Sequence, residues 1–167
     1  MEFRIQKKKN ENIHAYPTTD LKLAQQFAQQ LKNELGEFLM SAILFGSSVR
    51  RETSPESDID VLVISDDTSF ELSEALIETY RIIVEKAIVR TSPKLHVTSM
   101  TFTSFWEYAK AGDPVVVNIL RDGVALIDTG FFEPLQILLK KGRIRPSEES
   151  IWRYYGRAPQ TLLNSKW

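Results

Sequence analysis

The chain has 167 residues, 43% hydrophobic and 26% charged, a composition ordinary for a globular domain that can bury a real core. It contains no cysteine, which excludes disulfides, thiolate metal ligands and thiol nucleophiles. The net charge of −1 provides no global basic field, which argues against nucleic acid as a partner. No apolar run approaches a membrane span and the N-terminus lacks a signal-peptide core, so we expect a cytoplasmic protein without membrane contact.

Hydrophobic periodicity predicts alternating helices and strands over the first two thirds of the chain. Asp20 is a candidate N-cap for the first helix, and Thr68 or Ser69 for the second, which Pro93 cannot continue. The predicted elements are a helix to about Glu34, strands over 38–45 and 59–65, a helix to about Val89, a strand over 94–102 and a helix over 104–110.

The last third is harder to interpret. Asp113-Pro114 resembles an N-cap with proline at the first helical position, whereas Val115–Val117 would suit a strand. We expect a short helix, a strand over Val124–Ile127, a helix over 131–141, and a final helix from about Ser147 to Asn164. These elements suggest a core over 1–128 and a C-terminal helical extension over 129–167.

The final helix is rich in aromatic residues, among them Trp152, Tyr154 and Tyr155. Such a stripe most simply docks on the domain or on a second copy, which is consistent with a homodimer. The alternative is a platform for stacking a base, with Arg153 and Arg157 as cationic support.

The stretch from Ala42 to Ile64 carries most of the functional information. One apolar run ends at Gly46-Ser47, and after ten residues Asp58-Ile59-Asp60 opens a second run. Because side chains alternate along a strand, Asp58 and Asp60 point to the same face. Two carboxylates at a strand start, facing a Gly-Ser turn, suit Mg²⁺ that also takes oxygens from a nucleoside triphosphate.

The Gly-Ser turn has its own chemistry. Gly46 has no Cβ, so its backbone N–H groups can approach a phosphate closely. Ser47 and Ser48 can add hydroxyl donors, and Arg50 is near enough in sequence to reach a phosphate oxygen as a fixed cation.

The order strand, Gly-Ser, ten-residue gap, Asp-x-Asp and strand resembles the nucleotidyltransferases of the DNA polymerase β superfamily. It looks most like their minimal branch, which includes the antitoxin partners of HEPN-type toxins. The resemblance implies an α/β fold with a small mixed sheet and flanking helices. It also implies that Gly46, Ser47, Asp58 and Asp60 surround a metal-bound triphosphate, with Arg50 as the family's arginine. Arg51 stands where the family commonly has glycine.

In the family a third acid comes from a later strand, which here corresponds to Lys94–Met100. Alternation places Lys94, His96 and Thr98 on one face, and neither face of this segment carries an acid. His96 is one candidate replacement, as a metal ligand or general base.

The third acid can also come from elsewhere in the chain, the candidates being Glu85, Asp66 and Asp67. Alternatively, metal binding is weakened and nucleotide is bound without turnover, with Lys94 replacing a metal's charge toward phosphate. The sequence leaves these possibilities open.

The resemblance implies a cytoplasmic nucleotidyltransferase that depends on Mg²⁺ or Mn²⁺. Such an enzyme moves a nucleoside monophosphate from an NTP, such as ATP, to an acceptor hydroxyl. The acceptor is a small molecule, a protein or an RNA end. Asp58, Asp60 and His96 are the expected catalytic residues, Asp58 and Asp60 being the metal ligands. Gly46, Ser47, Ser48 and Arg50 are expected to bind the nucleotide. The alternative is a catalytically weak or inactive antitoxin-like module that binds nucleotide and a HEPN-type partner protein.

Overall fold

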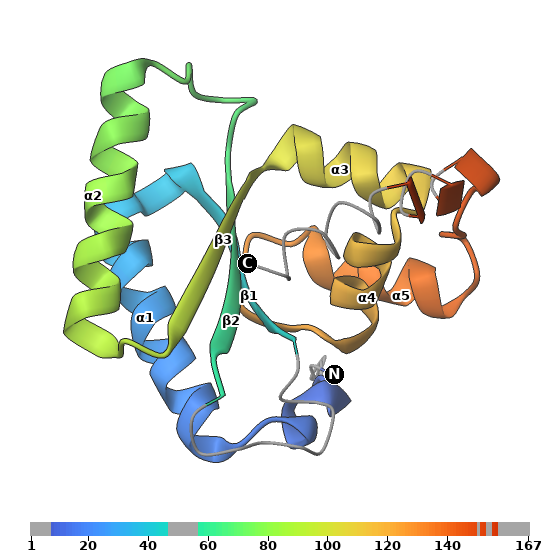
Figure 1. Ribbon diagram of the computed structural model, residues 1–167, viewed down its shortest axis with the longest axis horizontal. Helices are drawn as coiled ribbons and strands as arrows, with labels where there is room; N and C mark the ends of the chain where they lie inside the picture. The colour runs from blue at the N-terminus through green and yellow to red at the C-terminus, as the bar shows by residue number, and fades with distance from the viewer. Residues whose placement is uncertain (1–7, 47–56, 150, 153–154, 157–167) are drawn as a thin grey trace, which may run out of the picture.

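The structure is a computed structural model that describes residues 8–46, 57–149, 151–152 and 155–156. A four-stranded mixed sheet in the order β3-β2-β1-β4 lies at its centre (Figure 1). The strands are β1 (Leu39–Phe45), β2 (Ile59–Ser65), β3 (Leu95–Thr101) and β4 (Val124–Asp128). The fold is thus α/β, as predicted, and each predicted strand exists to within about a residue at either end.

Strand directions bring the motif residues to one edge of the sheet. β1 runs antiparallel to both β2 and β4, whereas β2 and β3 are parallel. Phe45 at the end of β1 pairs with Asp60 at the start of β2, and Asp60 pairs with His96 at the start of β3. Residues far apart in sequence therefore share one end of the sheet.

Helices cover both faces of the sheet, which gives three layers (Figure 1). On one side lie α1 (Thr18–Leu35) and α2 (Glu74–Thr91). On the other lie α3 (Phe102–Ala111), α4 (Pro114–Asp122) and α5 (Phe132–Lys140). Two short 3₁₀ helices, η1 (Glu11–Ala15) and η2 (Gly36–Phe38), flank α1 in the chain.

The central strands are apolar on both faces because each face packs against helices. Along β2, Val61 and Val63 belong to the apolar cluster under α1 and α2, and Leu62 and Ile64 to the cluster under α3, α4 and α5. All four are fully buried, and burial of each such side chain is worth about 1.5–3 kcal/mol. Alternation then places the Asp60 side chain on the side of α3, α4 and α5.

The first helix begins earlier than predicted. Pro17 directly precedes α1, and Asp20 lies in its first turn instead of capping it. The third helix also begins earlier, at Phe102, because the Thr101 hydroxyl accepts the Ser104 N–H and serves as the N-cap.

The second helix begins later than predicted. Thr68 and Ser69 do not start it, because their N–H groups donate to Asp66 Oδ1 at 2.8 and 3.1 Å and form a turn. Ser73 is the actual N-cap, and its hydroxyl accepts the Leu76 N–H. A buried aspartate thus competes successfully with the helix for these backbone donors.

The predicted helix–strand pair between residues 113 and 128 is present as α4 and β4. Asp113 Oδ1 accepts the N–H groups of Val115 and Val116, and Pro114 occupies the first helical turn. The cap and the proline override the β-propensity of the valines, of which Val116 is fully buried in the core.

The predicted final helix, including Pro159, falls largely outside the described residues. Residues 148–149, 151–152 and 155–156 are helical. Trp152 and Tyr155 are 74% and 64% exposed. None of the helices described is long and apolar enough to cross a bilayer.

Candidate active site

The candidate site lies where β1 ends and β2 begins. Gly46 follows β1 with φ +102°, in the left-handed region that favours glycine, and Asp60 lies across from Phe45 on β2. The Asp60 carboxylate packs directly against Gly46. Asp58 is exposed and precedes β2 by one residue.

His96 joins this site from the neighbouring strand. Parallel pairing puts it directly beside Asp60, with 3.0 Å between His96 Nδ1 and Asp60 Oδ1. An ionised carboxylate can only accept, so Nδ1 donates and Nε2 is the nitrogen left for other partners. The His96 side chain is 68% exposed and that of Asp60 23%, so the pair is open to a ligand.

The predicted phosphate-binding residues Ser47, Ser48 and Arg50 lie outside the described residues, as does Arg51. Of the nucleotide-binding residues predicted from sequence, the structure describes Gly46. The nucleotide-binding role of all four residues remains a prediction.

The structure argues against each alternative source of a third acid. Asp66 follows the far end of β2, and the six residue steps from Asp60 to Asp66 span about 20 Å. Asp66 bonds the Thr68–Ser69 turn, and Asp67 accepts from the backbone and hydroxyl of Thr103. Both acids therefore have structural roles away from the site.

Glu85 is equally remote. It is exposed on α2, which packs by Val84 and Ala87 on the opposite face of the sheet from the Asp60 side chain. Lys94, in contrast to these acids, lies at the same edge of the sheet as Asp60. It directly precedes β3, and its carbonyl accepts the Ile59 N–H. Continuing the parallel register by one residue places Lys94 beside Asp58.

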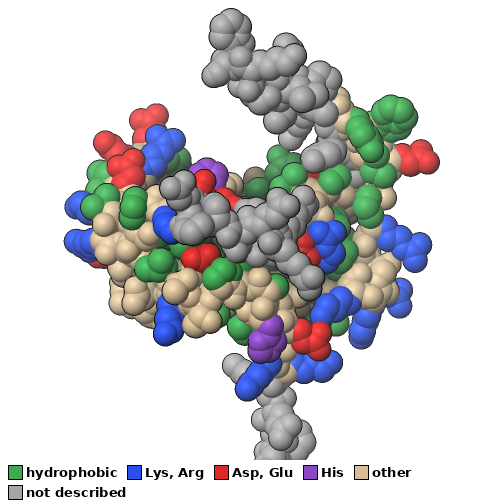
Figure 2. Space-filling model, turned by 60° about the horizontal axis from the view of Figure 1, so that its bottom comes forward, with side chains coloured by type: hydrophobic (Ala, Val, Ile, Leu, Met, Phe, Trp, Pro, Cys, Tyr) green, Lys and Arg blue, Asp and Glu red, His purple; other side chains and the backbone are tan. Residues whose placement is uncertain are grey.

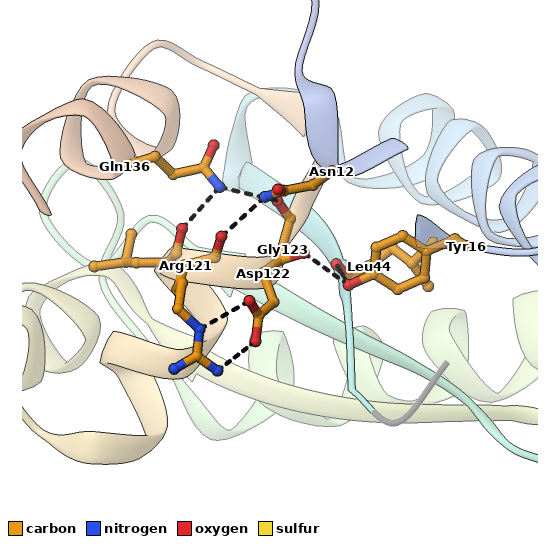
Figure 3. Close-up of polar contacts among 8 residues, drawn as sticks. Asn12, Tyr16, Leu44, Arg121, Asp122, Gly123 and Gln136 are labelled. Carbon is orange, nitrogen blue, oxygen red and sulfur yellow. Dashed lines mark hydrogen bonds and ion pairs between the residues drawn. The ribbon is translucent and has the colours of Figure 1, made fainter. Parts of the chain in front are cut away.

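Two groups near this edge escape prediction from sequence: Tyr16 and Asp122 (Figure 3). The buried Tyr16 hydroxyl donates to the Asp122 carbonyl at 2.9 Å and lies 3.5 Å from the Leu44 carbonyl. Burial raises the pKa of Tyr16 well above its usual range, and the negative charges of Asp122 and Asp60 raise it further. No local pattern could reveal this contact because it spans 106 residues of sequence.

The Asp122 carboxylate forms a two-point contact with Arg121, at 2.9 Å to Nε and 2.6 Å to Nη2 (Figure 3). The aspartate raises the pKa of Arg121 by this hydrogen bond. Asp122 thus adds negative charge near the Tyr16 side of the site, and Arg121 neutralises it locally.

Behind this pair, Gln136 fastens α5 to the end of α4. Its side-chain amide is buried and donates to the carbonyls of Leu120 and Gly123, at 2.9 Å each. Asn12 also donates to the Gly123 carbonyl, at 3.1 Å, so η1 converges on the same point (Figure 3). Side chains from η1 and α5 therefore hold the backbone at the end of α4.

The donor set suits one divalent ion better than two. Across the part of the chain that the structure describes, no three acidic or histidine side chains lie close enough together to hold an ion by themselves. Asp58 and Asp60 supply two carboxylates, and Mg²⁺ often takes only one or two while the rest of its shell is water and substrate phosphate. The residues present therefore fit an ion that arrives with a nucleotide.

A groove of about 580 Å³ lies between the N-terminal arm and α5. It is lined by Lys8, Lys9, Asn10, Glu11, Glu133, Gln136, Ile137, Lys140 and Lys141. Figure 2 shows Lys and Arg side chains on both sides of the face that it displays, with more of them toward the lower right. None of the predicted site residues that the structure describes lines this groove, so the candidate active site is a separate feature.

Comparison with known proteins identifies the domain. The sequence profile described as a nucleotidyltransferase domain matches residues 24–126, which is more than half of the chain. No curated protein matches the sequence significantly.

Three solved structures are similar. A candidate nucleotidyltransferase from Sulfolobus solfataricus is 19% identical, with a TM-score of 0.42 over 60% of this chain and 82% of the other. A toxin–antitoxin complex with AMP-PNP is 14% identical, with a TM-score of 0.43 over 85% of this chain and 96% of the other. A mutant of the toxin–antitoxin pair MntA-HpeT is also 14% identical, with a TM-score of 0.41 over 86% and 96%.

Proposed function

Because this chain belongs to the nucleotidyltransferase-domain family, we propose that it transfers a nucleoside monophosphate from an NTP to an acceptor hydroxyl in a metal-dependent reaction. The observation that carries the proposal is the Asp60 carboxylate packed against the Gly46 turn. The contact brings Asp60, the proposed metal ligand, next to the Gly46 backbone, the proposed phosphate-binding group, at one edge of the sheet. This geometry supports the binding of a metal-bound triphosphate at that edge.

In this proposal Asp58 and Asp60 hold Mg²⁺ or Mn²⁺, which when bound neutralises charge on the triphosphate. The N–H groups after Gly46 bind β- and γ-phosphate oxygens, together with Ser47 and Ser48. Arg50 stabilises the charge that develops as pyrophosphate leaves. All of these roles depend on orientation and charge.

The transfer itself is a single displacement. The acceptor oxygen forms a bond to the α-phosphorus, the bond from that phosphorus to the bridging oxygen breaks, and pyrophosphate departs with the electron pair. The proton of the acceptor hydroxyl moves to His96 Nε2, which the Nδ1–Asp60 hydrogen bond orients. His96 therefore acts as general base in the proposed reaction.

A second candidate function is a binding module that retains the nucleotide site without turnover. The specific observation in its favour is the pair of basic or neutral side chains, Lys94 and His96, on the strand where the family has its third acid. An ammonium beside Asp58 can attract phosphate but cannot hold a metal. Such a module would act through a partner protein, and by its resemblance a HEPN-type toxin is the partner to test.

The decisive experiment is thermal unfolding with each NTP, with and without Mg²⁺ or Mn²⁺. A ligand that binds only the folded state, at about 100-fold above its Kd, should raise the melting temperature by about 5–10 °C. The transferase proposal predicts a metal-dependent shift that is lost in the Asp58→Ala/Asp60→Ala double variant. Glu85→Gln, which changes an acid on the opposite face, is the matched control and should keep the shift.

A shift that needs no metal would favour the binding module. A shift that survives in the double variant would remove Asp58 and Asp60 from the site. Absence of any shift with all NTPs would overturn both functions. Once an acceptor is known, Asp60→Asn should abolish transfer without unfolding the protein, and an unchanged rate would contradict the assigned role.

A further inference from the structure

The edge of the sheet carries the carboxylates of Asp58 and Asp60 and the imidazole of His96, and the structure defines the contact between Asp60 and His96. His96 and Asp60 are directly paired across parallel strands, and their side chains are 3.0 Å apart on the same face. This pairing results from the strand register and not from a mobile loop. The imidazole is thus a fixed neighbour of the principal metal ligand.

No other acid is available to complete a second ion site among the described residues. On the His96 face of β3, the following side chains belong to Thr98 and Met100. Asp66 and Asp67 lie at the far end of β2, and Glu85 lies on the opposite layer. The Asp122 carboxylate is occupied by Arg121.

Two-ion phosphoryl transfer uses a pair of divalent ions about 3.5–4 Å apart, which needs carboxylate oxygens that bridge or flank them. Here Asp60 Oδ1 accepts from His96 Nδ1, and Oδ2 lies against Gly46. A second ion next to Asp60 would have to displace the imidazole N–H and would gain no third carboxylate from the residues that the structure describes. The charge balance of the site therefore favours one ion.

We propose that this site binds a single divalent ion together with its nucleotide, and that His96, oriented by Asp60, stands where a second ion would otherwise be held. This inference rests on the proposed nucleotide-binding function and specifies its metal stoichiometry. The site then lacks an ion beside the acceptor hydroxyl. His96 Nε2 is the group that faces the acceptor in its place.

The test counts Mn²⁺ ions bound to the full chain at a saturating concentration of a non-hydrolysable NTP analogue. The analogue is the AMP-PNP-type derivative of whichever NTP gives the thermal shift. Electron paramagnetic resonance of Mn²⁺ measures the bound number, and exchange broadening reports two ions within a few ångströms of each other. Neither readout depends on catalytic turnover or on knowing the acceptor.

Two variants of His96 form a matched pair that differs mainly in charge. His96→Asn places an amide N–H close to the position of Nδ1 and should keep one bound ion. His96→Asp restores a carboxylate in the same place and should bind two ions, with exchange broadening. The chain has two histidines, so His14→Asp on η1 is the control and should keep one ion.

The outcomes distinguish failure of the one-ion inference from failure of the proposed nucleotidyltransferase function. One ion in the wild type, with a second gained only in His96→Asp, supports the proposal. Two ions in the wild type overturn it and leave the nucleotidyltransferase function standing. No ion in the wild type overturns both. The wild-type count decides even where His96→Asp does not fold, which circular dichroism would show.

Discussion

The Asp60 carboxylate occupies the space that a side chain at Gly46 would need. A Cβ at Gly46 would lie 2.3 Å from Asp60 Oδ2 and 3.0 Å from its Cγ, closer than van der Waals contact allows. Gly46 also has φ +102°, which side chains other than glycine rarely adopt. The glycine is therefore required twice, for the turn and for the neighbouring aspartate.

Gly46→Ala should accordingly lower stability and abolish the NTP-dependent thermal shift, because Asp60 must move. The strained backbone alone costs about 1–3 kcal/mol. Gly130→Ala is the matched control, since Gly130 has φ +108° and nothing within 4 Å of a Cβ. It should lose similar stability from strain and retain nucleotide binding. Equal loss of nucleotide binding in both variants would contradict the assigned contact.

Tyr16→Phe should change the response of stability to alkaline pH. The pKa of Tyr16 is raised in the folded state, so its stabilising contribution is complete below the unfolded value of about 10 and is lost as pH rises beyond it. Removing the hydroxyl should reduce this alkaline loss by up to about 1.4 kcal/mol per pH unit. At neutral pH the variant should lose about 1 kcal/mol from the bond to the Asp122 carbonyl.

Urea unfolding at several pH values between 8 and 11 measures both effects of Tyr16→Phe. Tyr108→Phe, at an exposed position on α3, provides the control for loss of a hydroxyl at the surface. An alkaline slope unchanged from wild type in Tyr16→Phe would show that this tyrosine does not govern the transition.

Asp66→Asn should weaken the turn that delays the start of α2. The Thr68 hydroxyl, with the N–H groups of Thr68 and Ser69, lowers the pKa of Asp66 to about 2. Because the folded pKa lies below the unfolded value, this stabilisation is present above about pH 4 and is lost as pH falls toward 2. We expect the variant to cost about 1 kcal/mol at pH 7, after allowance for solvent screening, and to flatten the acid dependence.

Thermal unfolding of Asp66→Asn and wild type between pH 2 and 6 tests this. Glu37→Gln, an exposed acid on η2, should follow the wild-type curve. Parallel acid profiles for Asp66→Asn and wild type would rule out a role for the turn in acid stability.

Gln136→Leu should destabilise the contact between α4 and α5. It removes the amide that donates to the carbonyls of Leu120 and Gly123, and leaves the Leu120 carbonyl without this donor in a buried place. Loss of a buried partner of this kind costs about 1–3 kcal/mol. Gln25→Leu, on the exposed side of α1, should change the free energy of unfolding by less than about 0.5 kcal/mol in urea titration. A comparable change in the two variants would contradict the structural role of Gln136.

Local patterns were sufficient for most elements of the fold. β1, β2 and β4 follow from apolar runs and β3 from the alternation over 94–102. α4 follows from Asp113-Pro114 although three valines favour a strand. The error at the start of α2 has a definite cause. Thr68 and Ser69 are good capping residues, but their N–H groups donate to Asp66. Whether such residues cap a helix or form a turn with a nearby aspartate depends on how the turn packs.

The sequence by itself determined that Gly46 ends one strand and that Asp58 and Asp60 stand at the start of the next with their carboxylates on one face, since alternation along a strand depends only on local geometry. It also showed that neither face of the segment Lys94–Met100 carries an acid. Only the tertiary structure decided which side chain of that segment lies beside Asp60. His96 becomes the partner of Asp60 through the parallel register of β2 and β3, and Tyr16 reaches Asp122 across 106 residues. Long-range register arises from packing on both faces of the sheet, which no local pattern encodes.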